Sequence, residues 1–213
     1  MKKIIILLCI SFSFFSCDSF LDVNPDSEVV NDDMFNSADG VEDALYGVYM
    51  TMVTKDMYGR LMSNMIPEIL GQNFVSTYSY LPYLGRLEYD RSETRNMYKN
   101  MWKTGYLAIS YLNNIIENLE GKSEKDFRNY NLYMGEALGL RAAIHFDLLR
   151  FFAVHITSTN EAAKAKAIPY MTEYVFKVTP WSSVADAYTK IIAELERAET
   201  YLAEDDTYMP AHR

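Results

Sequence analysis

Apolar residues recur at steps of three and four along most of the chain, the spacing that places them on one face of an α-helix. The longest such run extends from about Glu93 to Phe152, with one interruption near Gly121. It predicts two long helices packed as an antiparallel hairpin. The predicted apolar faces are Tyr98, Trp102, Gly105, Ile109, Leu112, Ile116 and Leu119 in the first helix, and Met134, Leu138, Arg141, His145, Leu148 and Phe152 in the second.

The break between the two predicted helices contains residues typical of a helix end and of a helix start. Gly121 favours the left-handed conformation that ends helices, and Ser123 followed by Asp126 resembles a capping box that begins the next helix.

Arg141 stands on the otherwise apolar face of the second predicted helix. We expect its guanidinium to reach a buried carboxylate or a helix end, and ligand binding is the alternative.

Shorter periodic segments flank the hairpin. One helix is predicted to follow an N-cap at Ser37, and a second to cover Tyr58 to Leu70, kinked or shortened by Pro67. A last helix is predicted from Ser183 to Leu202, with Asp186 completing a capping box. The apolar faces are Val41, Ala44, Leu45, Val48, Tyr49 and Met52 in the first of these helices, and Val184, Tyr188, Ile191, Leu195, Ala198 and Leu202 in the last. The pattern predicts an all-α chain of helix pairs like those of tetratricopeptide repeats.

Helical periodicity disappears between Gln72 and Arg91, where aromatic residues gather beside Pro82 and Gly85. Exposed rings can stack on the apolar faces of sugars, and amide groups can bond their hydroxyls. We therefore take this aromatic loop as the candidate ligand site. Its candidate residues are Asn73, Tyr78, Tyr80 and Tyr83. The alternative is an irregular loop whose tyrosines cover the core.

Composition narrows the class of protein. With 49% hydrophobic residues the chain can bury a sizeable core, and 29 acidic against 20 basic residues argue against nucleic acid as a partner. The histidines His145, His155 and His212 have no metal-ligand spacing, and no nucleophile or phosphate-loop motif is present. We expect no enzyme activity, no metal and no cofactor.

The first residues have the order of a bacterial lipoprotein signal. Lys2 and Lys3 precede an apolar run from Ile4 to Phe15, too short to span a membrane, and Ser16 stands directly before Cys17. We expect residues 1–16 to be a signal peptide, 17–34 a tether acylated at Cys17, and 35–213 a helical domain. The alternative is an ordinary secretion signal with an incidental cysteine.

Several motifs then follow one another in the order found in a known family. Phe20-Leu21-Asp22 lies just after Cys17, and Phe35 precedes Ala44-Leu45-Tyr46-Gly47-Val48-Tyr49. Further motifs are Gly135-Glu136-Ala137, Leu140-Arg141-Ala142, Phe146-Asp147-Leu148 with Arg150, and Ile168-Pro169-Tyr170-Met171-Thr172-Glu173. From Cys17 to about Leu202 the chain resembles the SusD/RagB family of nutrient-binding surface lipoproteins.

This resemblance implies a function. Members of the family sit as lids on a SusC-like TonB-dependent channel of the outer membrane and capture glycans or other nutrients at the cell exterior. The predicted partners are that transporter, an oligosaccharide or other nutrient, and the membrane through the lipid. Two other classes stay open: a lipoprotein scaffold without ligand binding of its own, and a surface hydrolase.

The last predicted helix has an apolar face but no helix after it to cover that face. Members of the family are also considerably longer. We therefore expect residues 35–213 to be an incomplete SusD-like fold, truncated at its C-terminus, that aggregates or binds ligand weakly when isolated.

Overall fold

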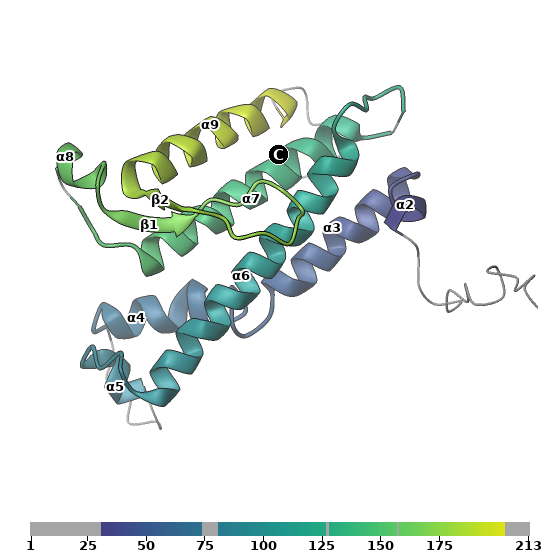
Figure 1. Cartoon of the computed structure of the whole chain (residues 1–213). Helices are drawn as coiled ribbons and strands as arrows, with labels where there is room; N and C mark the ends of the chain where they lie inside the picture. Colours follow the sequence, from purple (N-terminus) through teal and green to yellow (C-terminus); the bar gives the residue numbers. More distant parts are fainter. Residues whose placement is uncertain (1–30, 74–80, 127, 157, 203–213) are drawn as a thin grey trace, which may run out of the picture.

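The computed structural model describes residues 31–73, 81–126, 128–156 and 158–202, which are mostly helical (Figure 1). The helices are α2 (Asn31–Met34), α3 (Ala38–Met52), the π-helix η2 (Leu61–Met65), α4 (Ile66–Leu70), α5 (Leu81–Gly85), α6 (Ser92–Leu119), α7 (Tyr130–Phe152), α8 (Thr159–Ala162) and α9 (Val184–Leu202). Two short antiparallel strands, β1 (Lys166–Pro169) and β2 (Trp181–Ser183), form a small sheet. The all-α prediction is confirmed. Cys17, the predicted signal peptide and most of the predicted tether lie outside the described residues.

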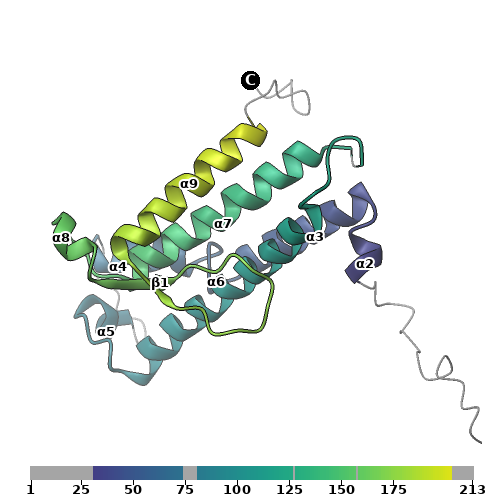
Figure 2. The same cartoon turned by 45° about the horizontal axis from the view of Figure 1, so that its top comes forward.

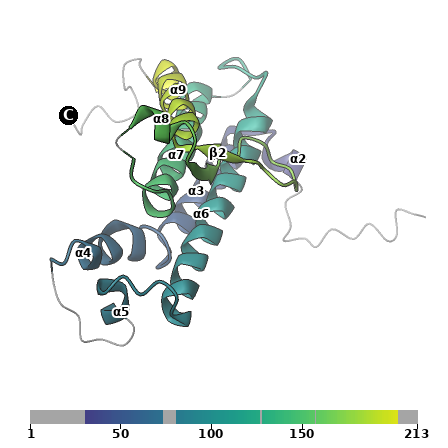
Figure 3. The same cartoon turned by 60° about the vertical axis from the view of Figure 1, so that its left-hand side comes forward.

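The long helices α6 and α7 form the centre of the molecule. α3 packs against both of them, while α9 lies along α7 (Figures 1 and 2). The short helices α4 and α5 lie at the opposite end of the molecule from α9 (Figure 3). The sheet packs on α7 and α9, so segments late in the chain close over the central hairpin.

The predicted faces of the central hairpin are confirmed. Ile109, Leu112 and Leu119 of α6 are fully buried, as are Leu138 and Leu148 of α7. The backbones of the two helices come close at a glycine: a Cβ added at Gly105 would lie only 3.0 Å from Leu148 Cδ2. A small residue at this crossing therefore sets the separation of the two helices.

Two predicted helix starts are confirmed by their caps. Ser37 Oγ accepts a hydrogen bond from the Gly40 N–H at 3.0 Å, directly before α3. Ser183 Oγ accepts one from the Asp186 N–H at 3.1 Å, directly before α9. In both helices the side chain satisfies an N–H that has no acceptor within the helix.

The predicted start of α7 at Ser123 is wrong. Asp126 Oδ2 accepts hydrogen bonds from both the N–H and the Oγ of Ser123, each at 2.9 Å, but these bonds close a turn. Asn129 then adopts a left-handed conformation with φ of 66°, and α7 begins at Tyr130. The hydrogen bonds between Ser123 and Asp126 form as in a capping box, but no helix follows them directly. The left-handed backbone of Asn129 interrupts the chain before α7. Gly121 has the expected positive φ of 81°.

The second predicted helix is divided. Residues 61–65 form a π-turn, in which the Met65 N–H bonds the Arg60 carbonyl at 3.0 Å, and only 66–70 are α-helical. Pro67 lies in the first turn of α4, where its missing N–H costs no helical bond. The expectation that periodic structure is absent from Gln72 to Arg91 is also wrong in part, because α5 forms there. A helix of five residues is too short to produce a periodic pattern.

The predicted apolar face of the last helix combines two different faces. Val184, Ile191 and Ala198 are buried as expected, but Tyr188 and Leu195 are 43% and 44% exposed. Leu202 is likewise exposed. The buried face is completed by Ala187 and Glu194. Tyr188 and Leu202 nevertheless contact α7, through Phe146 and Gly135, so the face of α9 towards α7 is wider than its fully buried residues alone.

Candidate functional site

A row of aromatic rings runs along α6 and joins segments that are distant in sequence. The Tyr98 ring contacts Tyr89 and Phe152, each at 5.8 Å between ring centres. Phe152 meets the edge of Trp102 at 4.9 Å, and Trp102 lies 5.8 Å from Trp181 of β2. Edge-to-face and tilted pairs are favourable ring geometries. The row therefore ties the start of α6, the end of α7 and β2 into one rigid aromatic surface.

At the Tyr89 end of this row the surface forms a hollow of about 440 Å³. It lies where the end of α4, the start of α6 and the end of α7 meet. The residues that line it are Leu70, Tyr89, Arg95, Tyr98, Arg150, Phe151 and Phe152. Mostly apolar and aromatic walls with a few charged groups are typical of sites for small organic ligands. We call this feature the aromatic hollow.

The guanidinium of Arg150 is held in position by Asp147 and by the Phe146 ring. Its Nε donates to Asp147 Oδ1 at 3.1 Å, while Asp147 Oδ2 accepts from the Tyr58 hydroxyl at 2.6 Å. The guanidinium also lies 5.2 Å from the centre of the Phe146 ring. Burial, and then the charge of Asp147, raise the pKa of the Tyr58 hydroxyl, so it remains a donor. These contacts orient a cation at the wall of the aromatic hollow.

Tyr98 supplies a neutral hydroxyl to the same hollow. Burial, with a smaller contribution from Tyr89, raises the pKa of Tyr98 well above its usual value. Its hydroxyl can therefore both donate and accept hydrogen bonds at neutral pH. Arg95 anchors its own guanidinium on the Asp90 carbonyl at 3.0 Å.

The segment between α5 and α6 is ordered by a compact charged cluster. The ring of Tyr83 lies 5.1 Å from the Arg86 guanidinium carbon and 4.7 Å from that of Arg91. Glu88 accepts from both arginines, at 2.7 and 2.9 Å, and the hydrogen bond from Arg86 contributes most to lowering the pKa of Glu88. This cluster fixes the segment that brings Tyr89 to the aromatic hollow.

Two of the four predicted ligand residues are described by the structure, and neither of these two lines the aromatic hollow. Tyr78 and Tyr80 lie outside the described residues. Asn73 is exposed and donates to Glu68 Oε2 at 2.7 Å. The ring of Tyr83 contacts the guanidinium groups of Arg86 and Arg91. Neither Asn73 nor Tyr83 lines the aromatic hollow, although Asn73 follows its lining residue Leu70 by three positions.

Of the rings in the aromatic hollow, Tyr89 lies in the predicted aromatic loop, whereas the other rings were predicted to pack in the core or were not singled out. Tyr98 and Phe152 were assigned to the apolar faces of the long helices, and Phe151 and Arg95 were not singled out. One signal was available: Tyr98 and Phe152 stand at the outer ends of those faces. There a helix pair has fewer neighbours to cover its side chains.

Arg141 fulfils the structural role predicted for it. Its guanidinium forms a buried ion pair with Glu194 of α9 and donates to Asn113 Oδ1 of α6 at 2.7 Å. The Tyr170 hydroxyl donates to the other oxygen of Glu194. The chain after β1 is thus fixed to three helices by one polar cluster. A hollow beside this cluster is lined in part by Arg141, Tyr170 and Glu194, but the internal partners already satisfy the charge of Arg141.

The aromatic hollow combines hydrogen-bond donors with ring faces and apolar walls. Its arginines are donors, its tyrosines are amphipathic and its remaining walls are apolar. Within the described ranges no group of three or more metal-ligating side chains comes together. Among those same residues no helix is long and apolar enough to cross a membrane.

Fold and site together define an α-helical hairpin protein with an aromatic hollow on its surface. Residues 19–213 match the SusD-like family described as "Starch-binding associating with outer membrane". The match covers most of the chain, so the chain belongs to the SusD-like family, as its motifs predicted.

Known relatives agree with this assignment. A SusD-like protein of Formosa agariphila is 23% identical over 95% of this chain, which spans 38% of that relative. A solved putative sugar binding protein of Bacteroides vulgatus is 25% identical with a TM-score of 0.66, covering 78% of this chain and 37% of its own. A SusD superfamily protein of Bacteroides fragilis is 25% identical with a TM-score of 0.63, covering 83% and 42%. The chain therefore spans about two fifths of the length of these relatives.

Proposed function

We propose that this chain is part of an outer-membrane lipoprotein that binds a glycan in the aromatic hollow. The observation that carries the proposal is the hollow itself, in which rings from three segments surround two arginines in a member of the SusD-like family. Rings suit the apolar faces of sugars, and fixed guanidinium groups suit their hydroxyl or carboxylate oxygens. The protein binds its ligand without transforming it.

Each part of the hollow has a role in this proposal. Tyr89, which is 48% exposed, supplies a stacking face, and Tyr98 supplies a hydroxyl next to it. Arg150, oriented by Asp147, donates to ring oxygens or to an acidic group. Tyr78 and Tyr80 add further rings from the segment that follows Asn73.

The remaining parts of the proposal concern location and delivery. Cys17 carries the lipid that holds the protein on the outer face of the outer membrane, after residues 1–16 are removed. A SusC-like TonB-dependent transporter receives the captured nutrient. The family description supports the outer-membrane location, because it places members in association with that membrane.

A binding screen followed by paired variants tests the ligand site. A glycan array and calorimetry with the best hit give the reference affinity. Tyr89→Ala should weaken binding about twofold to twelvefold, because a ring contact contributes roughly 0.5–1.5 kcal/mol. Tyr111→Ala is the matched control, since Tyr111 is a similarly exposed ring on α6 outside the hollow lining.

The same titrations decide the role of the aromatic loop. Tyr78→Ala, Tyr80→Ala and Tyr83→Ala should each weaken binding if the loop contributes. Full affinity in all three variants would make that loop structural only. Full affinity in Tyr89→Ala as well would remove the hollow from the proposal. Binding of no glycan at all would favour the scaffold alternative, and turnover of a bound glycan would favour the hydrolase.

A further inference from the structure

The aromatic hollow carries positive charge on a chain that is acidic as a whole. Arg95 of α6 and Arg150 of α7 both line it, and its other described lining residues are aromatic or apolar, without a carboxylate among them. The chain has 29 acidic and 20 basic residues, for a net charge of −9. The lining of the aromatic hollow is therefore opposite in charge to the molecule around it.

Arg95 contributes a charge that no described carboxylate offsets by an ion pair. Its Nη2 donates to the Asp90 backbone carbonyl at 3.0 Å, and that acceptor is neutral. The side chain is exposed, and a guanidinium has five N–H donors and no acceptor. Arg95 thus keeps donors and positive charge for a ligand.

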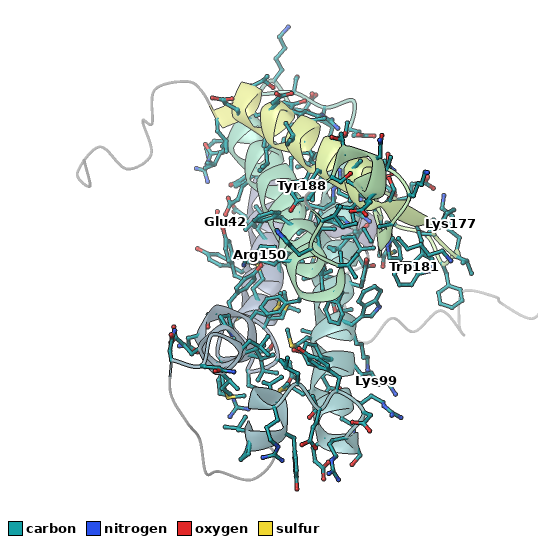
Figure 4. The ribbon with its side chains drawn as sticks, turned by 90° about the vertical axis from the view of Figure 1, so that its left-hand side faces the viewer. Glu42, Lys99, Arg150, Lys177, Trp181 and Tyr188 are labelled. Carbon is teal, nitrogen blue, oxygen red and sulfur yellow. The ribbon has the colours of Figure 1, made fainter. Side chains whose placement is uncertain are left out.

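Arg150 belongs to two neighbouring hollows. Its Nε and Nη2 both donate to Asp147 Oδ1, so this carboxylate offsets part of its charge and fixes the plane of the guanidinium, which is still 53% exposed. Figure 4 shows Arg150 and Tyr188 near one another on α7 and α9. The second hollow, of about 320 Å³, has no carboxylate among its described lining residues either. They are Leu149, Arg150, Ala153, Val154, His155, Ile156, Val184 and Tyr188.

The side chains of the aromatic hollow offer many hydrogen-bond donors and few acceptors. Its guanidinium groups only donate, and the hydroxyls of Tyr89 and Tyr98 are the acceptors among its described lining side chains. Hydroxyl groups of an uncharged sugar both donate and accept, so a site for such a sugar needs acceptors for their protons. A carboxylate or a sulfate accepts without donating. The excess of donors therefore suits an anionic group better than a hydroxyl.

We propose that the glycan bound in the aromatic hollow is anionic, with carboxylate groups as in uronic acids or with sulfate groups. This inference rests on the proposed function, because it names the class of glycan for the same site. Tyr89 stacks on the apolar face of one sugar, while Arg95 and Arg150 bind the charged substituent. Since Arg150 lines both hollows, a neighbouring sugar of the same chain extends towards the second hollow.

A glycan array that carries uronate, sulfated and uncharged oligosaccharides tests the class of ligand. The strongest binders should carry carboxylate or sulfate groups, and the array shows which of the two is preferred. If uncharged oligosaccharides bind most strongly, this inference is wrong and the proposed glycan site remains. Binding of no glycan at all would remove both.

Matched ligands isolate the effect of charge in calorimetric titrations. A uronate oligosaccharide is compared with the same oligosaccharide after methyl esterification of its carboxyl groups, and a sulfated one with its desulfated form. The charged form should bind at least about tenfold more tightly, because hydrogen bonds to charged groups are the stronger ones. Raising the salt concentration from about 0.05 to about 0.5 M should remove most of this difference, since salt screens exposed charges. Equal affinities of the two forms would contradict the proposal.

Arginine substitutions connect the charge preference with the aromatic hollow. Arg95→Gln and Arg150→Gln should each weaken binding of the charged form about fivefold or more and change binding of the uncharged form little. Arg128→Gln is the matched control, because Arg128 is 72% exposed and lines neither hollow. Tyr89→Ala should weaken both forms alike. An unchanged charge preference in both glutamine variants would place the anionic group elsewhere and overturn the proposal.

Two further measurements separate binding from folding. Arg150→Gln leaves Asp147 without its cation, so its thermal midpoint is compared with that of the unmodified protein. If that midpoint falls, Arg95→Gln decides the question, because Arg95 is exposed and bonds a neutral carbonyl. Arg150→Lys keeps the charge but loses the planar fork, and it should retain part of the charge preference. A charge preference lost as completely in Arg150→Lys as in Arg150→Gln would show that charge at this position is not what the ligand senses.

Discussion

Single residues decide how the late segments of the chain attach to the central hairpin. His145 of α7 is fully buried, and its Nδ1 lies 2.9 Å from the Arg141 carbonyl. Its Nε2 accepts from the Met171 N–H at 3.1 Å, so Nδ1 carries the proton. The ring also stacks on Tyr170 with 4.0 Å between centres. Acceptance at Nε2 together with donation from Nδ1 requires the neutral imidazole in one tautomer.

His145 makes the stability of the fold depend on pH. Burial, which outweighs the opposing hydrogen bond to Arg141, lowers the pKa of His145 from 6.5 to about 3. The unfolded chain therefore binds a proton below pH 6.5 that the folded chain excludes. The free energy of unfolding should fall from about pH 6.5 down towards pH 3, by up to about 1.4 kcal/mol per pH unit.

Denaturant unfolding at pH values from 7 to 4 measures this dependence. His145→Gln retains an amide that can donate and accept at the same site but does not titrate. Its stability should decline less steeply with acidification than that of the unmodified chain. Identical slopes for the two proteins would show that His145 does not contribute to the pH dependence.

The buried ion pair is a second prediction for single residues. Glu194→Ala removes the carboxylate and leaves the Arg141 guanidinium buried, which should cost about 3–5 kcal/mol of stability. Glu196, which is exposed and lies two residues further along α9, is the control, and Glu196→Ala should cost less than about 0.5 kcal/mol. Chemical denaturation of both variants gives the comparison. Replacing Arg141 by Met and Glu194 by Leu together should recover part of the loss.

At the scale of elements, small residues determine how closely the long helices approach. Gly105 faces Leu148 across the contact between α6 and α7, whereas a Cβ added at Gly139 of α7 would meet only Ala198 Cβ, at 3.9 Å. Both glycines lie inside long helices, so alanine gives each helix the same gain in propensity. Only Gly105 has a crowded neighbour.

Alanine substitution at these two glycines separates packing from helix propensity. Gly139→Ala should stabilise the protein by up to about 1 kcal/mol, since its Cβ fits without movement. Gly105→Ala should leave the protein roughly 1–3 kcal/mol less stable than Gly139→Ala, because Leu148 is fully buried and has to shift. Thermal unfolding of the two variants is sufficient. Equal midpoints would mean that the contact between α6 and α7 adapts freely.

At the scale of the whole molecule, the proposed lipid at Cys17 predicts where the protein is found. In the proposed function, acylation of Cys17 attaches the protein to the membrane. Stable anchoring by acyl chains needs more than one chain or a second attachment. Cys17→Ala should release the protein into soluble fractions or stop its processing, as measured by fractionation and mass spectrometry of the N-terminus. Unchanged membrane retention without any lipid on the N-terminus would contradict this assignment.

Local patterns in the sequence were sufficient to predict the long helices. The period of the apolar residues in α6 and α7 reports which side of each helix is buried, since one face repeats over many turns. The caps at Ser37 and Ser183 were predictable for a similar reason: side chain and backbone donor are three residues apart. The family motifs were predictable because they are stretches of sequence.

The remaining features depended on contacts between distant segments. The aromatic hollow joins Leu70, Tyr89 and Phe152, whose positions in the sequence give no sign that they meet. A carboxylate partner for Arg141 could be expected from the sequence. Glu194 could not be identified as that partner, because the spacing of apolar residues in α9 did not show which side of the helix is buried. The failure of the predicted helix to start after Ser123 depended on the left-handed backbone of Asn129.

The sequence by itself determined the helical class, the central hairpin and the membership of the SusD-like family, because these follow from spacings within short stretches. Only the tertiary structure decided which rings line the aromatic hollow and which charges pair. It also decided which residues of α9 are buried against α7. Burial and pairing depend on the three-dimensional neighbours of a residue, and packing brings those neighbours together from distant parts of the chain.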